Sequence, residues 1–151
     1  MPDTKMIIYI GADHRVFKLK ELLKKYLLGK EYRVLDLGNS IFNPKDDYPD
    51  FASRVAKKVS ANPKNSRGIL ICGSGVGMDI VANRYKKVRS VLTANPKQAA
   101  ASRSDDDTNA LSLPADFLNF GSAKKIVDAW LKTLFSGAAR HRRRLKKIAG
   151  L

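Results

Sequence analysis

Two hydrophobic patterns alternate along the chain from one end to the other. Short apolar, β-branched runs such as 6–10 and 68–72 are typical of buried parallel strands. Between these runs, apolar residues recur at the three- and four-residue spacing of amphipathic helices. The pattern predicts five strands, at residues 6–10, 32–38, 68–72, 89–93 and 110–113. It predicts helices at about residues 16–27, 49–59, 78–85, 96–104 and 121–135, and a basic helix from about residue 138.

Single residues support several of these boundaries. Asp13 stands where a helix N-cap is expected, and Pro49 suits the first turn of a helix. The segment from Asn39 to Asp47 contains the Asn, Pro and Asp residues of a loop. The side chains expected to face the core are Phe51, Val55 and Val59 in one helix, and Ile126, Val127, Trp130, Leu131 and Leu134 in another.

Strands that alternate with helices require β-α-β crossovers, so the sequence predicts an α/β fold. We expect a three-layer, Rossmann-like domain over residues 1–151, with a five-stranded, mainly parallel sheet and a C-terminal basic helix. Ligands of such folds bind outside the carboxyl ends of the strands. We expect three polar segments to meet there: 11–14, 72–77 and 104–109.

Charge and cysteine content indicate which partners and which cellular compartment to expect. The formal net charge is +15, which favours acidic partners such as phosphorylated metabolites, and the densest basic block is 140–147. We interpret most of the charge as solvated helix faces plus a local phosphate site, and nucleic-acid binding as the less favoured explanation. No apolar run is long enough to span a membrane. The only cysteine excludes an internal disulfide, so a cytoplasmic protein is expected.

The loop Gly73-Ser74-Gly75-Val76-Gly77 lies between a predicted strand and a predicted helix. Glycines let backbone N–H groups approach a ligand closely, and such groups at a helix N-terminus form a site for an anion. The loop lacks the Gly-Lys-Ser/Thr of a P-loop and the third glycine of a dinucleotide-binding motif. An oxyanion or phosphate site is therefore expected here.

Cys72 directly precedes this loop, and its position alone leaves two interpretations open. A thiol facing a helix N-terminus is favoured as a thiolate, whereas most free cysteines are buried and inert. For His14, a lone histidine after a strand, a hydrogen-bonded structural part is favoured over a catalytic one. Two distant histidines and one cysteine give no metal-ligand spacing, so no metal is expected. Arg140 and Arg144 share one helix face, an arrangement that suits a phosphate group.

Four ordered motifs together resemble the ribose-5-phosphate isomerase B / galactose-6-phosphate isomerase family, over nearly the whole length of the chain. They are "IGADHRVFKLKELLKKYL", "VLDLG" with "DDYPDFASRVAKKV", "GILICGSGVGMDIVANR" and "GAARHRRRLKKI". The resemblance implies interconversion of an aldose and a ketose phosphate through an enediolate. It implies neither a metal nor an organic cofactor.

The resemblance also implies a part for each site residue. Cys72 would be the base, with Ser74 beside it, and the backbone N–H groups of Gly73, Gly75 and Gly77 would hold the enediolate oxygen. Asp13 would bind sugar hydroxyls and assist ring opening, and His14 and Tyr48 would line the pocket. Arg140 and Arg144 would hold the phosphate across the interface of a homodimer or tetramer. The further substrate-contacting positions are Asp106, Asn109 and His141.

Three positions depart from the pattern of the ribose-type members. Asp105 replaces a histidine assigned to ring opening, Asp106 replaces an asparagine, and Pro114-Ala115-Asp116 replaces a Gly-x-Arg whose arginine helps to hold phosphate. The leading substrate is ribose 5-phosphate. The alternatives are another pentose or hexose phosphate, and a non-catalytic relative that binds phosphosugars or nucleic acid.

Overall fold

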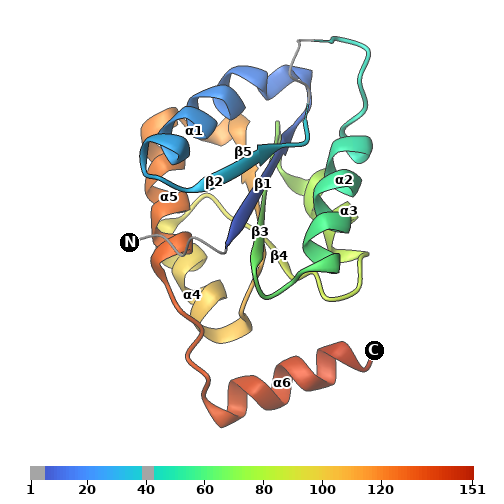
Figure 1. The fold of residues 1–151 in the computed structure, drawn as a ribbon, viewed down its shortest axis with the longest axis vertical. Coiled ribbons are helices and arrows are strands. Elements are labelled where there is room, and N and C mark those ends of the chain that lie inside the picture. The colour runs from blue at the N-terminus through green and yellow to red at the C-terminus, as the bar shows by residue number, and fades with distance from the viewer. Residues whose placement is uncertain (1–5, 39–42) are drawn as a thin grey trace.

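Five strands form one sheet in the computed structural model, which describes residues 6–38 and 43–151 (Figure 1). They are β1 (Ile7–Ala12), β2 (Arg33–Asp36), β3 (Ser66–Cys72), β4 (Ser90–Leu92) and β5 (Ala110–Pro114). Their order is β2-β1-β3-β5-β4, and every pair is parallel. The predicted mainly parallel sheet is confirmed. Part of the predicted loop from Asn39 to Asp47 lies outside the described residues.

Helices cover both faces of the sheet, so the predicted three layers are confirmed (Figure 1). One face carries α1 (Phe17–Gly29), α4 (Pro96–Asp106) and α5 (Phe120–Lys132), and the other carries α2 (Tyr48–Ala61) and α3 (Val76–Asn83). Two short 3-10 helices are η1 (His14–Val16) and η2 (Ala115–Phe117). The basic helix α6 (Ala139–Ala149) follows and stands off from these layers.

Alternation along the central strand β3 builds both halves of the core. Ile69 and Ile71 are fully buried toward α1, α4 and α5, whereas Leu70 and Cys72 are buried toward α2 and α3. Successive side chains of a strand point to opposite faces, so a strand covered on both faces is apolar at every position. The same alternation directs the Cys72 thiol to the side of the sheet on which α3 begins.

The strand order places a crevice beside the end of β3. The chain leaves β1 toward β2 on one side, and β3 returns on the other side of β1. Neighbouring crossovers therefore diverge at the carboxyl ends of β1 and β3, which is where open α/β sheets bind ligands.

The expectation that segment 104–109 lies at this carboxyl edge is wrong. Ala110, which follows it, pairs with Gly68 near the start of β3. A crossover helix between parallel strands carries the chain back to the opposite edge, so the end of α4 lies at the amino edge of the sheet. A seven-residue strand is about 20 Å long, and within one chain roughly that length separates Asp105 from Cys72.

A second correction concerns the end of α5. This helix ends at Lys132, and the expected inward side chain of Leu134 is 81% exposed. Ile126, Val127 and Trp130 are fully buried as predicted. The helical spacing extends further in the sequence than the helix does, because the chain turns away toward α6. In the described residues, no helix is both long and apolar enough to cross a membrane.

Candidate active site

Three segments meet at the carboxyl edge of the three central strands. The register pairs Ala12 with Ile71 and Cys72 with Pro114, so Asp13 is level with Cys72 at the ends of β1, β3 and β5. The N–H of Asp116 donates to the Gly73 carbonyl at 2.9 Å, which ties the segment after β5 to the loop after β3. Asp13 and the loop from Gly73 to Gly77 are therefore brought together with Cys72, as predicted.

The Cys72 sulfur accepts a hydrogen bond from the backbone. The residue is 6% exposed, and the Gly75 N–H donates to Sγ at 3.2 Å. Gly75 is the N-cap of α3 and has φ of 78°, a left-handed conformation that favours glycine. The Cys72 sulfur therefore lies against a backbone N–H donor and beside the N-terminus of α3.

The first turn of α3 presents backbone N–H groups beside the thiol. Ser74 is exposed, and its Oγ accepts from Val76 N at 3.2 Å. The first N–H groups of a helix have no intrahelical acceptor, which leaves those of Gly77 and Met78 to face an anion, whereas the Asp79 N–H already donates to the Gly75 carbonyl. A Cβ on Gly77 would lie 2.5 Å from the ring of Tyr48, which covers this turn. Tyr48 thus lies against the loop, where the sequence predicted it to line the pocket.

Asp13 caps the short helix η1 and remains partly buried. Its carboxylate accepts from Arg15 N at 3.1 Å. Burial raises the pKa of Asp13 above its ordinary value, against the lowering influence of the Arg15 N–H bond and of His14. A carboxyl group with a raised pKa exchanges protons more readily near neutral pH than an ordinary aspartate does.

His14 is held by a carboxylate that sequence reasoning missed. Its Nδ1 lies 2.8 Å from Oδ1 of Asp46, and its backbone N–H donates to the same oxygen at 3.2 Å. With a carboxylate on Nδ1, that nitrogen carries the hydrogen and Nε2 is the acceptor of the neutral ring. Asp46 lies 32 residues away in a loop, so no local spacing links the two.

An ion pair between Arg15 and Asp116 lies over the Gly73 backbone. Arg15 Nη2 is 3.2 Å from Oδ1 of Asp116, and both side chains are about half exposed. A Cβ on Gly73 would be 2.8 Å from Nη1 of Arg15 and equally close to Oδ2 of Asp116. Because Asp116 is neutralised in this way, it repels a nearby phosphate less than an unpaired carboxylate would. Sequence reasoning missed Arg15, although both residues directly follow strands that flank β3.

Asp105, Asp106 and Asn109 lie at the other edge of the sheet. Asn109 is 1% exposed, and its side chain binds the backbone at Arg89 and Lys87, both at 2.8 Å. These bonds give Asn109 a structural part in joining β5 to β4. Asp105 is about half exposed at the end of α4. Within one chain, none of the three is brought to Cys72.

One side chain of α6 is buried and anchors the helix, whereas its arginines are exposed. His141 is 5% exposed; its Nδ1 lies 2.6 Å from Oγ of Ser136, and its Nε2 lies 3.7 Å from Oδ1 of Asp105. His141 therefore fixes the start of α6 to the end of α4. Arg140 and Arg144 are exposed and, like the rest of α6, belong to the side of the molecule opposite Cys72 (Figure 1).

A protein-family model matches the part of the chain that contains nearly all of these residues. The profile of the family described as Ribose/Galactose Isomerase matches residues 8–148. The chain belongs to this family. The match extends from β1 through α6, so it includes both the Cys72 edge and the basic helix.

Individual members of the ribose/galactose isomerase family are similar over almost their full length. A probable ribose-5-phosphate isomerase B of Mycoplasma genitalium is 44% identical over 93% of this chain and 92% of its own length. Ribose-5-phosphate isomerase B of Escherichia coli is 38% identical over 95% of both chains. The crystal structure of the Mycoplasma genitalium enzyme with bound ribulose 5-phosphate superposes with a TM-score of 0.94 and 42% identity, over 98% of this chain and 97% of that one.

The ribose/galactose isomerase fold brings few metal-binding side chains together in this chain. In segments 6–38 and 43–151, no three His, Cys, Asp or Glu side chains gather closely enough to hold a metal ion. The groups at the Cys72 edge are instead a thiol, a partly buried carboxyl, an imidazole and backbone N–H donors. This set can move protons and hold an oxyanion.

Proposed function

We propose that this protein is an aldose–ketose isomerase that interconverts ribose 5-phosphate and ribulose 5-phosphate through an enediolate. The observation that carries the proposal is the Cys72 thiol at the end of β3, level with Asp13 and bonded by the N–H of Gly75. Relatives that match almost the whole chain are named ribose-5-phosphate isomerase B, and one of them is solved with ribulose 5-phosphate bound. We expect the reaction to need neither a metal nor an organic cofactor.

In the proposed reaction the Cys72 thiolate removes the proton from C2 of the open-chain aldose. The electron pair of that C–H bond forms the C1–C2 double bond, and the carbonyl oxygen on C1 becomes the enediolate oxygen. Return of the proton to C1, with transfer of the O2 proton to O1, gives the ketose. Fixed N–H donors of the Gly73–Gly77 loop stabilise charge that develops only during this step, apart from those of Gly75 and Val76, which already bond Cys72 Sγ and Ser74 Oγ.

Three other residues of the edge prepare the substrate. Asp13, with its raised pKa, exchanges a proton with a ring hydroxyl and so assists ring opening. His14, oriented by Asp46, offers Nε2 to the sugar, and Tyr48 covers the first turn of α3. We assign Ser74, whose hydroxyl is exposed beside the thiol, to contact with the reacting carbons.

We further propose that each complete site combines residues of two chains in a homodimer, itself able to pair into a tetramer. Arg140 and Arg144, which we assign to the phosphate, lie on the side of the chain opposite its own Cys72, as do Asp105 and Asp106. Several apolar side chains are exposed at both places: Val76 and Ile80 on α3, and Leu134 and Ile148 near α6. Burial of such side chains favours association, and a two-fold dimer brings each α6 to the other subunit. We expect a cytoplasmic enzyme.

A second candidate substrate is a different pentose or hexose phosphate. Asp105, Asp106 and Asp116 place three carboxylates at positions where ribose-type members carry His, Asn and Arg. Rates with a panel of pentose and hexose phosphates distinguish the two. A clear preference for ribose 5-phosphate supports the first proposal, and a preference for another sugar supports the second.

Substitution of Cys72 tests the proposed chemistry. Cys72→Ala is expected to lower kcat by about a thousandfold or more, because it removes the group that carries the proton. The side chain is small and lies at the end of a strand, so the far-UV circular dichroism of the folded protein should not change. Conversion of ribose 5-phosphate by Cys72→Ala at a rate close to that of the unsubstituted protein would contradict the proposal.

A further inference from the structure

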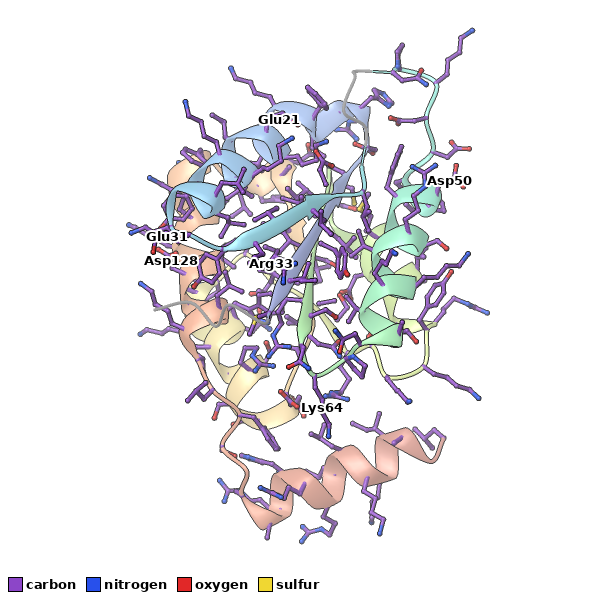
Figure 2. All side chains as sticks on the ribbon, viewed as in Figure 1. Glu21, Glu31, Arg33, Asp50, Lys64 and Asp128 are labelled. Atoms are coloured by element: carbon purple, nitrogen blue, oxygen red, sulfur yellow. The ribbon has the colours of Figure 1, made fainter. Side chains whose placement is uncertain are left out.

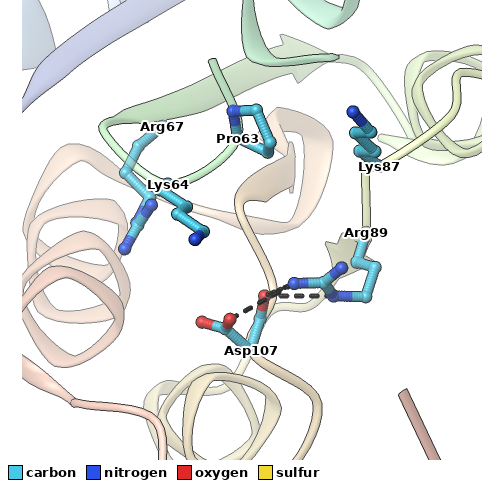
Figure 3. A pocket seen from close by; sticks show the side chains of 6 residues that line it. All are labelled: Pro63, Lys64, Arg67, Lys87, Arg89 and Asp107. Carbon is cyan, nitrogen blue, oxygen red and sulfur yellow. Dashed lines mark hydrogen bonds and ion pairs between the residues drawn. The ribbon is translucent and has the colours of Figure 1, made fainter. Parts of the chain in front are cut away.

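A second cavity opens at the amino edge of the sheet, away from Cys72. Its volume is about 310 Å³, and its lining residues are Pro63, Lys64, Arg67, Lys87, Arg89 and Asp107. Figure 3 shows Lys64 and Arg67 on one wall, Lys87 and Arg89 on the other, and Asp107 between them. The walls come from the segments that lead into β3, β4 and β5.

The charges around this cavity do not balance. Four of the lining side chains are cationic, and one is a carboxylate. That carboxylate is already paired, because Asp107 lies 3.3 Å from Arg89 Nη2 and 2.7 Å from Arg103 Nη1. Arg103 is outside the lining but adds a further positive charge behind it. The cavity therefore has an excess of positive charge after every ion pair at its wall is counted.

Arg67 carries the clearest uncompensated charge. The side chain is partly buried, and its guanidinium donates to the Ser66 carbonyl at 2.8 Å. Among the described residues, no carboxylate lies within 4 Å of it. Burial, followed by repulsion from Arg103, lowers the pKa of Arg67 to about 10, and Asp107 only partly opposes this. At neutral pH the group is still charged, so among the described residues this partly buried cation has a backbone carbonyl but no carboxylate as its partner.

The opposite wall is held in place by Asn109. This buried side chain accepts from Arg89 N and donates to the Lys87 carbonyl, both at 2.8 Å. Lys87 itself has φ of 66°, a left-handed conformation that residues with a side chain seldom adopt. The fixed backbone keeps Lys87 and Arg89 at the rim of the cavity.

We propose that this cavity is a second anion site that binds a small phosphate-bearing molecule, at the opposite edge of the sheet from Cys72 of the same chain. A planar guanidinium and lysine ammonium groups are the side chains that hold phosphate oxygens in proteins. The volume of about 310 Å³ lies at the lower end of the range for small-ligand pockets. A phosphate group supplies the negative charge that the walls lack.

NMR of the full-length protein with inorganic pyrophosphate tests the proposal directly. Saturable shifts are expected at the backbone amides of Gly68 and Asn109, which lie at the amino edge. The variant Lys64→Gln/Arg67→Gln/Lys87→Gln should weaken this binding by about tenfold or more, because charged hydrogen bonds are lost. Lys64→Gln/Lys87→Gln, which changes only exposed side chains, should weaken it by a smaller factor and keeps the test valid if Arg67 is needed for folding.

The matched control removes the same charge elsewhere. Lys25→Gln/Lys125→Gln, matched to the double variant, changes two exposed helix lysines on α1 and α5 and should leave pyrophosphate binding within about twofold of the original, since distant surface charges are screened. The KM and kcat for the sugar phosphate should not change in either set. Equal weakening in both sets, shifts confined to Gly73 and Gly75, a raised KM in the cavity variants, or a change of oligomeric state in them without pyrophosphate binding would each overturn the proposal.

Discussion

Substitution of Gly77 by alanine tests how closely Tyr48 packs on the first turn of α3. A Cβ there would lie 2.5 to 2.6 Å from ring atoms of Tyr48, a side chain that is 40% exposed and free to move outward. We expect Gly77→Ala to fold but to displace the Tyr48 ring, with a loss in kcat/KM of about tenfold. Steady-state kinetics of Gly77→Ala, Tyr48→Ala and the double variant measure this.

The double variant separates displacement of the ring from direct obstruction of the substrate. If displacement of Tyr48 is the whole effect, Gly77→Ala adds no further loss once Tyr48 is alanine. Losses that add in the double variant would mean that the methyl group blocks the substrate itself, and the part assigned to Tyr48 would then be wrong.

Residues of the site differ in how far the sequence could predict them. Cys72 and the glycines after it stand in one strand–loop–helix segment, so local pattern was enough to place them. Asp46 and the pairing of Arg15 with Asp116 depend on contacts 32 and 101 residues apart in the chain. Such contacts are decided by how strands are ordered in the sheet, which spacing along the sequence does not specify.

At the scale of elements, a hydrogen bond joins two helices on the same face of the sheet. The Tyr26 hydroxyl of α1 lies 2.9 and 2.7 Å from the two carboxylate oxygens of Asp128 in α5, which Figure 2 labels. We expect Tyr26→Phe to lower the free energy of unfolding by about 1 kcal/mol at pH 7, a value kept small because the pair is partly exposed.

The contribution of this bond should depend on pH in a defined window. The Asp128 carboxylate raises the pKa of Tyr26 from 10.0 to about 12. A raised pKa means that folding favours the protonated phenol, so the stabilisation is complete below pH 10 and is lost as the pH rises to about 12. Thermal unfolding at pH 8 to 12 should show the original protein and Tyr26→Phe converging, and a constant difference would contradict this account.

Element order explains which part of the fold could be read from the sequence. Strand and helix positions follow from periodicity, and all five predicted strands are present within a few residues of their predicted bounds. The edge of the sheet at which segment 104–109 lies depends on the direction in which each crossover carries the chain. Segment 104–109 was predicted at the wrong edge because α4 carries the chain back to the amino edge of the sheet before β5 begins.

At the scale of the whole molecule, two incomplete chains are expected to complement each other. Cys72→Ala lacks the proposed base, and Arg140→Ala/Arg144→Ala lacks the proposed phosphate contacts, so each homodimer should be nearly inactive. Subunit exchange in an equal mixture turns about half of the dimers into heterodimers, and each heterodimer has one intact site of two. The mixture should therefore regain about a quarter of the original activity. No recovery after proven exchange would contradict a site shared between chains.

The central claim is that Cys72 moves a proton between C1 and C2 of a sugar phosphate. NMR of the protein with ribose 5-phosphate in D₂O follows that proton directly. We predict conversion to ribulose 5-phosphate with deuterium appearing at C1 of the ketose and C2 of the aldose, and loss of both in Cys72→Ala. Unchanged deuterium incorporation in Cys72→Ala, or no conversion by the original protein, would contradict the claim.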